Sequence, residues 1–140
     1  ALCLEITGHT VVGQTSLSAI QHLRSLGVRI FLDDFGAGRA ALASLTRLPL
    51  DGIKLDSHLM NGADDHRRRA AVVRSMVHLA REMSVELVAK GIESPSQLQF
   101  LRAIGCPRAQ GYAIAHPMNP GEIGRYLSIQ RDQGGVRQAA

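Results

Sequence analysis

Residues 28–38, VRIFLDDFGAG, run five mostly apolar residues directly into two adjacent aspartates, a phenylalanine and a glycine-rich loop. A short β-branched and aromatic run bounded by glycines is typical of a buried strand. Asp33 and Asp34 therefore stand where the strand ends and the loop begins. Ligands and metals gather at the carboxyl ends of strands in parallel α/β folds. The alternative is that one of the two aspartates only caps the following helix.

The composition is that of one globular domain, with 140 residues of which 45% are apolar and 20% charged. No apolar run reaches membrane-spanning length and no signal-peptide pattern is present, so we expect a cytoplasmic protein without membrane insertion. Cys3 and Cys106 fit neither a zinc spacing nor a disulfide framework. The net charge of +4 is modest, and the arginines at 67–69 predict a solvated helix face rather than a site for a nucleic acid polymer.

Apolar segments of strand period alternate with segments of helical period along the chain. We expect strands at residues 2–7, 28–32, 52–56, 85–93 and 109–115. Helices are expected at about 15–26 and 40–47, from 64 or 65, from 95 and from 120. Connections that contain helices join parallel strands. The pattern predicts an α/β domain over residues 1–129 with a mainly parallel sheet, followed by a disordered tail at 130–140.

Polar side chains occur near the ends of all five expected strands. They are Glu5, Asp33, Asp34, Lys54, Asp56, Lys90, Glu93 and Gln110. Because parallel strands end at the same edge of a sheet, we expect these groups to form one site at the carboxyl edge of a barrel or open sheet. The histidines lack a metal-binding spacing as a group. For His116, beside the last strand, contact with a ligand is the alternative to a surface role.

Several motifs together resemble the EAL domain family, namely LEIT, LDDFGAG, LPLDGIKLD, VAKGIES and GCPRAQGYAIAHP in this order and spacing. The resemblance extends over residues 2–127. It implies a TIM-like (β/α) barrel, here a partial barrel of about five β/α units with a mainly parallel sheet. It also implies hydrolysis of the bacterial second messenger cyclic di-GMP to linear pGpG with two Mg²⁺ or Mn²⁺ ions. Two divalent ions held by carboxylates can activate water and clamp a phosphodiester for in-line displacement.

The resemblance also assigns roles to single residues by their place in the motifs. These are Glu5, Asp33 and Asp34 as metal ligands, Lys54 and Glu93 as catalytic residues, and Gln110 as a contact to the nucleotide; Arg39, which no family motif matches, is expected as a further contact to the nucleotide. Among them, Arg39 lies in a loop where the family usually has an aromatic residue and two serines, and this chain has alanines beside Arg39.

Lys90 is the departure from the family that decides the expected activity. It stands at the catalytic position where the family has the glutamate of A-E-G-V-E, a general base or metal ligand. A protonated lysine cannot ligate Mg²⁺, and its reference pKa of about 10.4, which neighbouring acids hold up, makes it a poor base. We expect Lys90 to abolish or severely reduce metal-dependent hydrolysis, and its ammonium could instead meet a phosphate of the ligand directly. The alternative is that Lys90 reaches into solvent at the strand end.

Two further observations weaken the expected metal site. The assigned residues bring four carboxylates and two ammonium groups, a net of two negative charges against two divalent ions. Gly8 and Ser57 stand where the family usually has charged residues, so the loop after the aspartate pair loses an anchor. These departures cluster on the site face, while the apolar patterns of the strands and helices are intact.

The chain begins after the Glu-Ala-Leu segment of the family and after the next metal-binding asparagine, so we expect it to be the carboxyl part of a longer barrel. The rest of the same polypeptide, a protein partner or a second copy in a homodimer would then cover the open sheet edges.

Two functions stay open at this point. The first is a degenerate EAL domain, inactive as a phosphodiesterase, that acts as a cyclic di-GMP receptor or as a protein-interaction module in bacterial signalling. The alternative is an active metal-dependent cyclic di-GMP phosphodiesterase that is completed by its amino-terminal segment.

Overall fold

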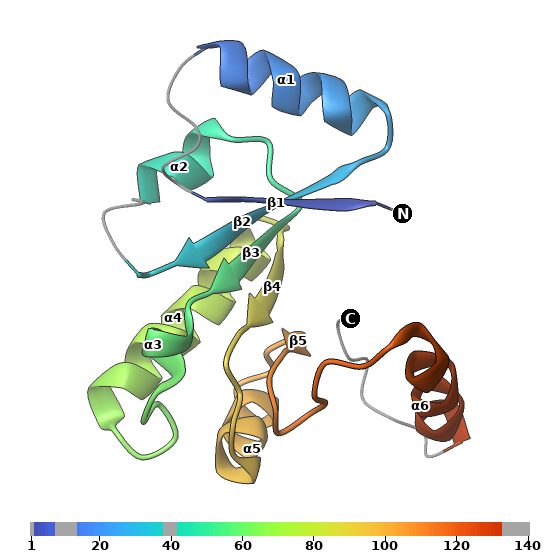
Figure 1. Cartoon of the computed structure of the whole chain (residues 1–140). Coiled ribbons are helices and arrows are strands. Elements are labelled where there is room, and N and C mark those ends of the chain that lie inside the picture. Colours follow the sequence, from blue (N-terminus) through green and yellow to red (C-terminus); the bar gives the residue numbers. More distant parts are fainter. Residues whose placement is uncertain (1, 8–13, 38–41, 133–140) are drawn as a thin grey trace.

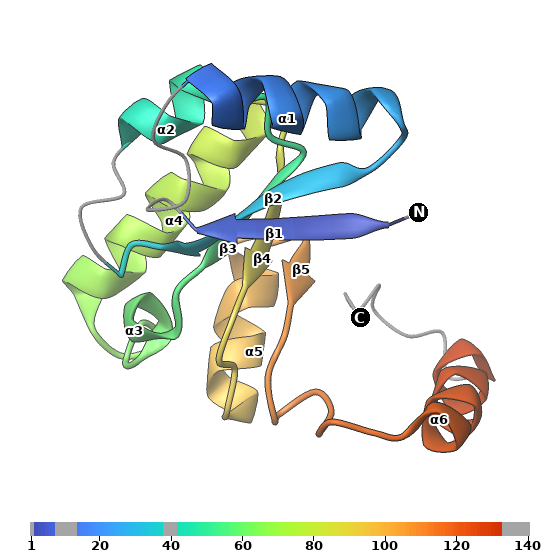
Figure 2. The same ribbon diagram turned by 45° about the horizontal axis from the view of Figure 1, so that its top comes forward.

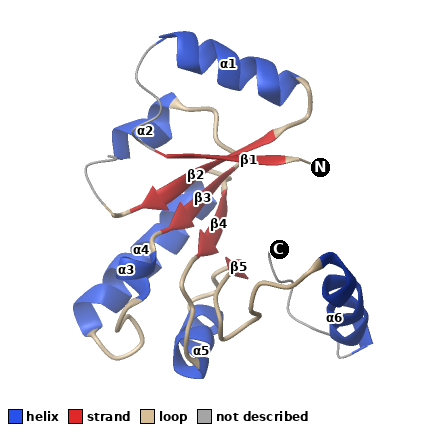
Figure 3. Cartoon of the chain, in the orientation of Figure 1, coloured by secondary structure: helices blue, strands red, loops and turns tan. Residues whose placement is uncertain are grey.

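A five-stranded parallel sheet organises the chain (Figures 1 and 3). The computed structural model describes residues 2–7, 14–37 and 42–132. The strands are β1 (Cys3–Thr7), β2 (Arg29–Phe35), β3 (Gly52–Leu55), β4 (Glu86–Ala89) and β5 (Arg108–Ala109), and they pair in sequence order. The helices are α1 (Gln14–Ser25), α2 (Leu42–Arg47), α3 (Ser57–Met60), α4 (Arg67–Glu82), α5 (Pro95–Ala103) and α6 (Pro120–Asp132). Each pair of neighbouring strands is parallel, which confirms the predicted α/β class.

The hydrophobic core lies between the sheet and the helices that cover one of its faces. Ile30 and Leu32 of β2 are fully buried there, together with Val73 of α4 and Leu101 of α5. Because side chains alternate along a strand, the residues between these apolar positions point to the other face of the sheet. The alternation of β2 thus separates a packed apolar face from a face that carries charged groups.

The charged face has an ion-pair cluster at the amino-terminal end of the sheet. Glu86 accepts a hydrogen bond of 2.7 Å from Arg29 and also pairs with Arg108. The Arg29 guanidinium lies 4.9 Å from the centre of the Phe31 ring. The Phe31 ring packs directly on Gly52, and a Cβ added to Gly52 would lie 2.2 Å from the ring. These groups fill the amino-terminal half of the face and leave the carboxyl half to the candidate site.

Two strands are much shorter than the sequence predicts. β4 ends at Ala89 rather than at residue 93, because Gly91 turns the chain with φ 68° directly after Lys90. β5 ends at Ala109 rather than at residue 115, because the chain enters a turn in which Gly111 accepts from the backbone N–H of Ile114. The residues that follow these two strands still make single backbone hydrogen bonds to neighbouring segments, but they do not continue the regular strand pairing.

Two helix boundaries also differ from the expectation. α3 has four residues, too few to leave a helical period in the sequence, and was not predicted. α4 begins at Arg67 rather than at residue 64 or 65, since the preceding segment forms turns in which His66 donates its backbone N–H to Gly62. The predicted start of α5 is confirmed, with Ser94 and Gln97 forming a reciprocal capping box.

Helix α6 stands apart from the sheet and is joined to β5 by the chain around residue 115 (Figure 2). It continues to Asp132, beyond the predicted domain end at residue 129, and the remainder of the predicted tail at 133–140 lies outside the described residues. Within the described part of the chain, no helix is both long enough and apolar enough to cross a membrane.

Candidate functional site

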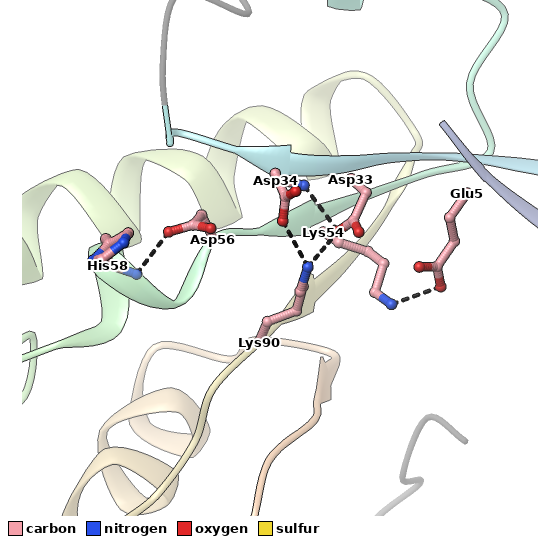
Figure 4. Close-up of polar contacts among 7 residues, drawn as sticks. All are labelled: Glu5, Asp33, Asp34, Lys54, Asp56, His58 and Lys90. Atoms are coloured by element: carbon pink, nitrogen blue, oxygen red, sulfur yellow. Dashed lines mark hydrogen bonds and ion pairs between the residues drawn. The ribbon is translucent and has the colours of Figure 1, made fainter. Parts of the chain in front are cut away.

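The ammonium group of Lys90 lies between the two neighbouring aspartates (Figure 4). Its Nζ donates to Asp33 Oδ1 at 2.7 Å and to Asp34 Oδ1 at 2.8 Å. Lys90 follows the end of β4, and the aspartates lie near the end of β2, so a loop and a strand far apart in sequence meet at the carboxyl edge of the sheet. The structure brings these three side chains together at that edge.

The backbone of Asp34 explains how two consecutive carboxylates reach the same nitrogen. In a regular strand, neighbouring side chains point to opposite faces. Here the pairing register between β2 and β3 shifts between Leu32 and Phe35, and Asp34 has a left-handed backbone with φ 52°. Its N–H donates a 2.8 Å hydrogen bond to Asp33 Oδ1. Non-glycine residues in this conformation are uncommon and cluster at functional sites.

In this cluster, Lys90 and Asp33 each stabilise the charged form of the other. Burial by itself lowers the pKa of Lys90, but its hydrogen bonds to Asp33 and Asp34 outweigh burial and hold the pKa above its ordinary value. Burial raises the pKa of Asp33, yet the bonds from Lys90 and from the N–H of Asp34 hold that pKa below its ordinary value. Lys90 is therefore a fixed cation at neutral pH and cannot act there as a base.

A second lysine neutralises the third expected metal ligand. Lys54 Nζ lies 2.6 Å from Glu5 Oε1, with the Lys54 side chain 10% exposed and that of Glu5 45% exposed. The two lysines of the chain, Lys54 and Lys90, are thus both engaged by the carboxylates of this site. The pair was not predicted from the sequence, in which Glu5 and Lys54 have separate roles; the two residues lie on β1 and β3, the strands on either side of β2.

Helix α3 supports the two chain segments that follow β2 and β4, next to the aspartates and Lys90. Asp56 caps α3 by accepting from the His58 backbone N–H at 2.8 Å, so this carboxylate is used by the helix rather than by the lysines (Figure 4). An added Cβ at Gly91 would lie 2.4 Å from Ser57 Cβ, and one at Gly36 would lie 2.3 Å from Leu59. Both loops thus pack on α3 through glycines.

Two further residues assigned by resemblance, Glu93 and Gln110, are exposed and contact the rest of the chain through their backbones. The Glu93 side chain is exposed, and its backbone N–H donates to Gln97 Oε1 at 2.8 Å. Gln110 is exposed as well, and its backbone bonds to Ala89 and Ile92 join β5 to the loop after β4. Arg39 and Gly8 lie outside the described residues.

The donor set tests whether a two-metal centre fits these side chains. Three carboxylates face two ammonium groups, so the paired cluster carries a net charge of one negative unit. Among the described residues, no group of three or more His, Cys, Asp or Glu side chains is arranged to hold a metal ion. Two divalent cations need oxygen ligands that are not already committed to lysines. The side chains of the described cluster do not fit two metal ions in this arrangement.

Comparison with known proteins identifies the family. The family model for the EAL domain matches residues 1–117 of the chain. The cyclic di-GMP phosphodiesterase RocR of Pseudomonas aeruginosa is 38% identical over 112 residues, which are 80% of this chain and 29% of RocR. The chain thus spans less than a third of the length of this curated relative.

Solved structures show the same fold. The EAL domain of Mycobacterium smegmatis DcpA superposes with a TM-score of 0.85 at 32% identity, covering 91% of this chain and 58% of that one. Klebsiella pneumoniae BlrP1, solved as a complex with manganese and cyclic di-GMP, gives a TM-score of 0.77 at 28% identity and covers 82% and 30% of the two chains. The chain belongs to the EAL domain family and has the TIM-like α/β fold of its members.

Proposed function

We propose that this EAL domain binds cyclic di-GMP as a receptor, without metal ions and without hydrolysing it. The observation that carries the proposal is the position of Lys90 Nζ, 2.7 and 2.8 Å from the carboxylates of Asp33 and Asp34. In this proposal the lysine takes the place of a metal cation between the two acids. The receptor role also draws on BlrP1, a relative solved with the nucleotide.

The chemistry of an ammonium group suits this role. Lys90 has three N–H donors, of which the aspartates take two. The third can donate to a phosphate oxygen, and a charge-assisted hydrogen bond of this kind is about twice as strong as a neutral one. Neutralisation of the aspartates also removes repulsion that would otherwise oppose a phosphodiester. Activation of water by a metal, in contrast, has no counterpart in a protonated lysine.

Calorimetric titration with cyclic di-GMP, in EDTA and in Mg²⁺, tests the proposal. We expect equal affinity in the two buffers. Lys90→Ala should weaken binding at least about tenfold, as expected for loss of a charge-assisted bond, while Lys90→Arg should retain most of it. Arg74→Ala, which removes an exposed positive charge on α4, is the matched control and should bind as the wild type does. A folded chain that binds in neither buffer contradicts the receptor proposal and favours the protein-interaction role.

The second candidate is an active metal-dependent phosphodiesterase. Retention of Glu5, Asp33 and Asp34, together with the similarity to the phosphodiesterase RocR, favours it. It requires Lys90 to leave the aspartates when metal binds. Chromatographic detection of pGpG after incubation with Mn²⁺ separates the candidates, since the receptor yields none.

A further inference from the structure

An exposed aromatic stack lies on the turn that follows β5. The rings of Tyr112 and His116 are stacked, with centroids 4.6 Å apart and planes inclined by 20°. Tyr112 is 61% exposed, and His116 is exposed as well. Isolated exposed aromatic residues are ordinary on protein surfaces. A pre-arranged parallel pair is different, because each ring covers one face of the other and leaves an outer face to solvent.

Backbone hydrogen bonds within the turn position the rings of Tyr112 and His116. Ile114 and Ala115 donate their N–H groups to the carbonyl of Gly111, at 2.9 and 3.1 Å. The turn brings residues four apart in sequence, Tyr112 and His116, face to face. Local backbone bonds within the turn therefore bring the two rings together.

The same turn is fastened to the loop that carries Lys90. Ile92 donates its N–H to the carbonyl of Gln110 at 3.1 Å, and Ala113 donates to the carbonyl of Ile92 at 2.9 Å. An added Cβ at Gly111 would come within 2.2 Å of the Ile92 backbone, so the approach requires glycine. Figure 1 shows the chain after β5 running beside the chain after β4, at the carboxyl edge of the sheet. Lys90 is two residues from Ile92, so the stack and the ammonium group lie on two segments joined by backbone bonds.

We propose that Tyr112 and His116 form a stacking platform for a purine base of the same nucleotide whose phosphate meets Lys90. Bases bind proteins by stacking on exposed aromatic faces, and this mode needs no particular hydrogen-bond pattern. In this proposal, the purine adds a third ring to the stack by packing on the outer face of Tyr112 or His116. The inference rests on the proposed receptor function and adds the purine as the recognised part of the ligand.

Substitutions at the stack test this assignment by calorimetric titration with cyclic di-GMP in EDTA. Tyr112→Ala should weaken binding about tenfold, the loss expected for one stacked base. Tyr112→Phe retains the ring and should bind within about twofold of the wild type, and His116→Ala should lose affinity in the same direction as Tyr112→Ala. Wild-type affinity in Tyr112→Ala overturns the platform alone, whereas a wild-type chain that binds no nucleotide overturns the platform and the receptor function together.

Tyrosine fluorescence gives a second readout that a purely structural role would not move. The chain has two tyrosines and no tryptophan, so Tyr126→Phe leaves Tyr112 as the sole emitter. Tyr126 donates its hydroxyl to the Ile114 carbonyl at 3.2 Å, and this variant removes that bond while keeping the ring. We expect Tyr112 emission, corrected for absorption by the nucleotide, to be quenched in parallel with binding. Binding without quenching would overturn the stacking contact.

Discussion

The backbone N–H of Asp34 donates a 2.8 Å hydrogen bond to the carboxylate of Asp33, the residue before it. This bond accompanies the left-handed conformation of Asp34, φ 52°, and directs both carboxylates to one side of the strand end. Two acids so close together repel each other unless a cation lies beside them. The ammonium group of Lys90 supplies that cation from within the chain.

The left-handed backbone at Asp34 predicts different effects for two small substitutions. Asp34→Gly and Asp34→Ala both remove the carboxylate, but only alanine keeps a Cβ that disfavours positive φ. We expect Asp34→Gly to have a free energy of unfolding about 0.5–1 kcal/mol higher than Asp34→Ala. Urea denaturation of the two variants measures the difference. Greater stability of the alanine variant would show that the strand end relaxes to ordinary backbone.

Removal of Lys90 should destabilise the fold through the aspartates it leaves behind. Lys90→Ala is expected to lose about 1–2 kcal/mol of unfolding free energy, because two facing carboxylates keep their repulsion and lose their hydrogen bonds. Adding Asp33→Asn should cost less than the sum of the two single changes, since one of the charges is then gone. Denaturation of the three variants gives the coupling. Additive effects would argue that Lys90 and Asp33 do not interact in solution.

Conversion of Lys90 to a carboxylate should change the metal chemistry of the site. Lys90→Glu replaces the cation by oxygen ligands and adds a third carboxylate beside Asp33 and Asp34. We expect Mn²⁺ affinity to rise at least about tenfold over wild type, as measured from free Mn²⁺ by electron paramagnetic resonance. Lys90→Gln, which removes the charge without supplying an anionic ligand, is the control. Equal Mn²⁺ binding by wild type and Lys90→Glu would mean that the lysine does not control the metal site.

An ion pair away from the site predicts how acid weakens the fold. Burial raises the pKa of Asp51, but the bidentate pair with Arg24 and the bond from the Ile30 N–H hold that pKa below its ordinary value. A carboxyl group with a lowered folded-state pKa stabilises the fold above its unfolded-state value, and this contribution is lost as pH falls through the folded-state pKa. Asp51→Asn should therefore cost about 1 kcal/mol near pH 7 and less near pH 2. An unchanged difference at the two pH values would contradict the assignment.

Sequence patterns predicted the parallel sheet and the meeting of strand ends because both follow from periodicity and from the geometry of parallel strands. Lys90, Asp33 and Asp34 could be assigned to one edge on this basis. That Asp33 and Asp34 point the same way could not be predicted, because regular alternation separates them and only the register shift joins them.

Other features depend on contacts that leave little trace in a single sequence. Helix α3 has one turn, which is below the length at which an apolar period can be read. From the sequence, Asp56 is expected in the site, but in the structure its carboxylate caps α3. Which of the two roles Asp56 takes depends on where α3 packs in the fold. The stack of Tyr112 on His116 requires the turn closed at Gly111, whose backbone bonds the sequence does not encode as a motif.

The replacement of the metal by Lys90 is tested most directly by a crystal structure of the chain soaked with MnCl₂ and cyclic di-GMP, with diffraction recorded at the manganese absorption edge. We predict nucleotide density beside Lys90, no anomalous peak between Asp33 and Asp34, and a lysine ammonium that still bridges their carboxylates. A manganese peak ligated by Asp33 and Asp34, with Lys90 turned away, would contradict the claim that this lysine has replaced the metal.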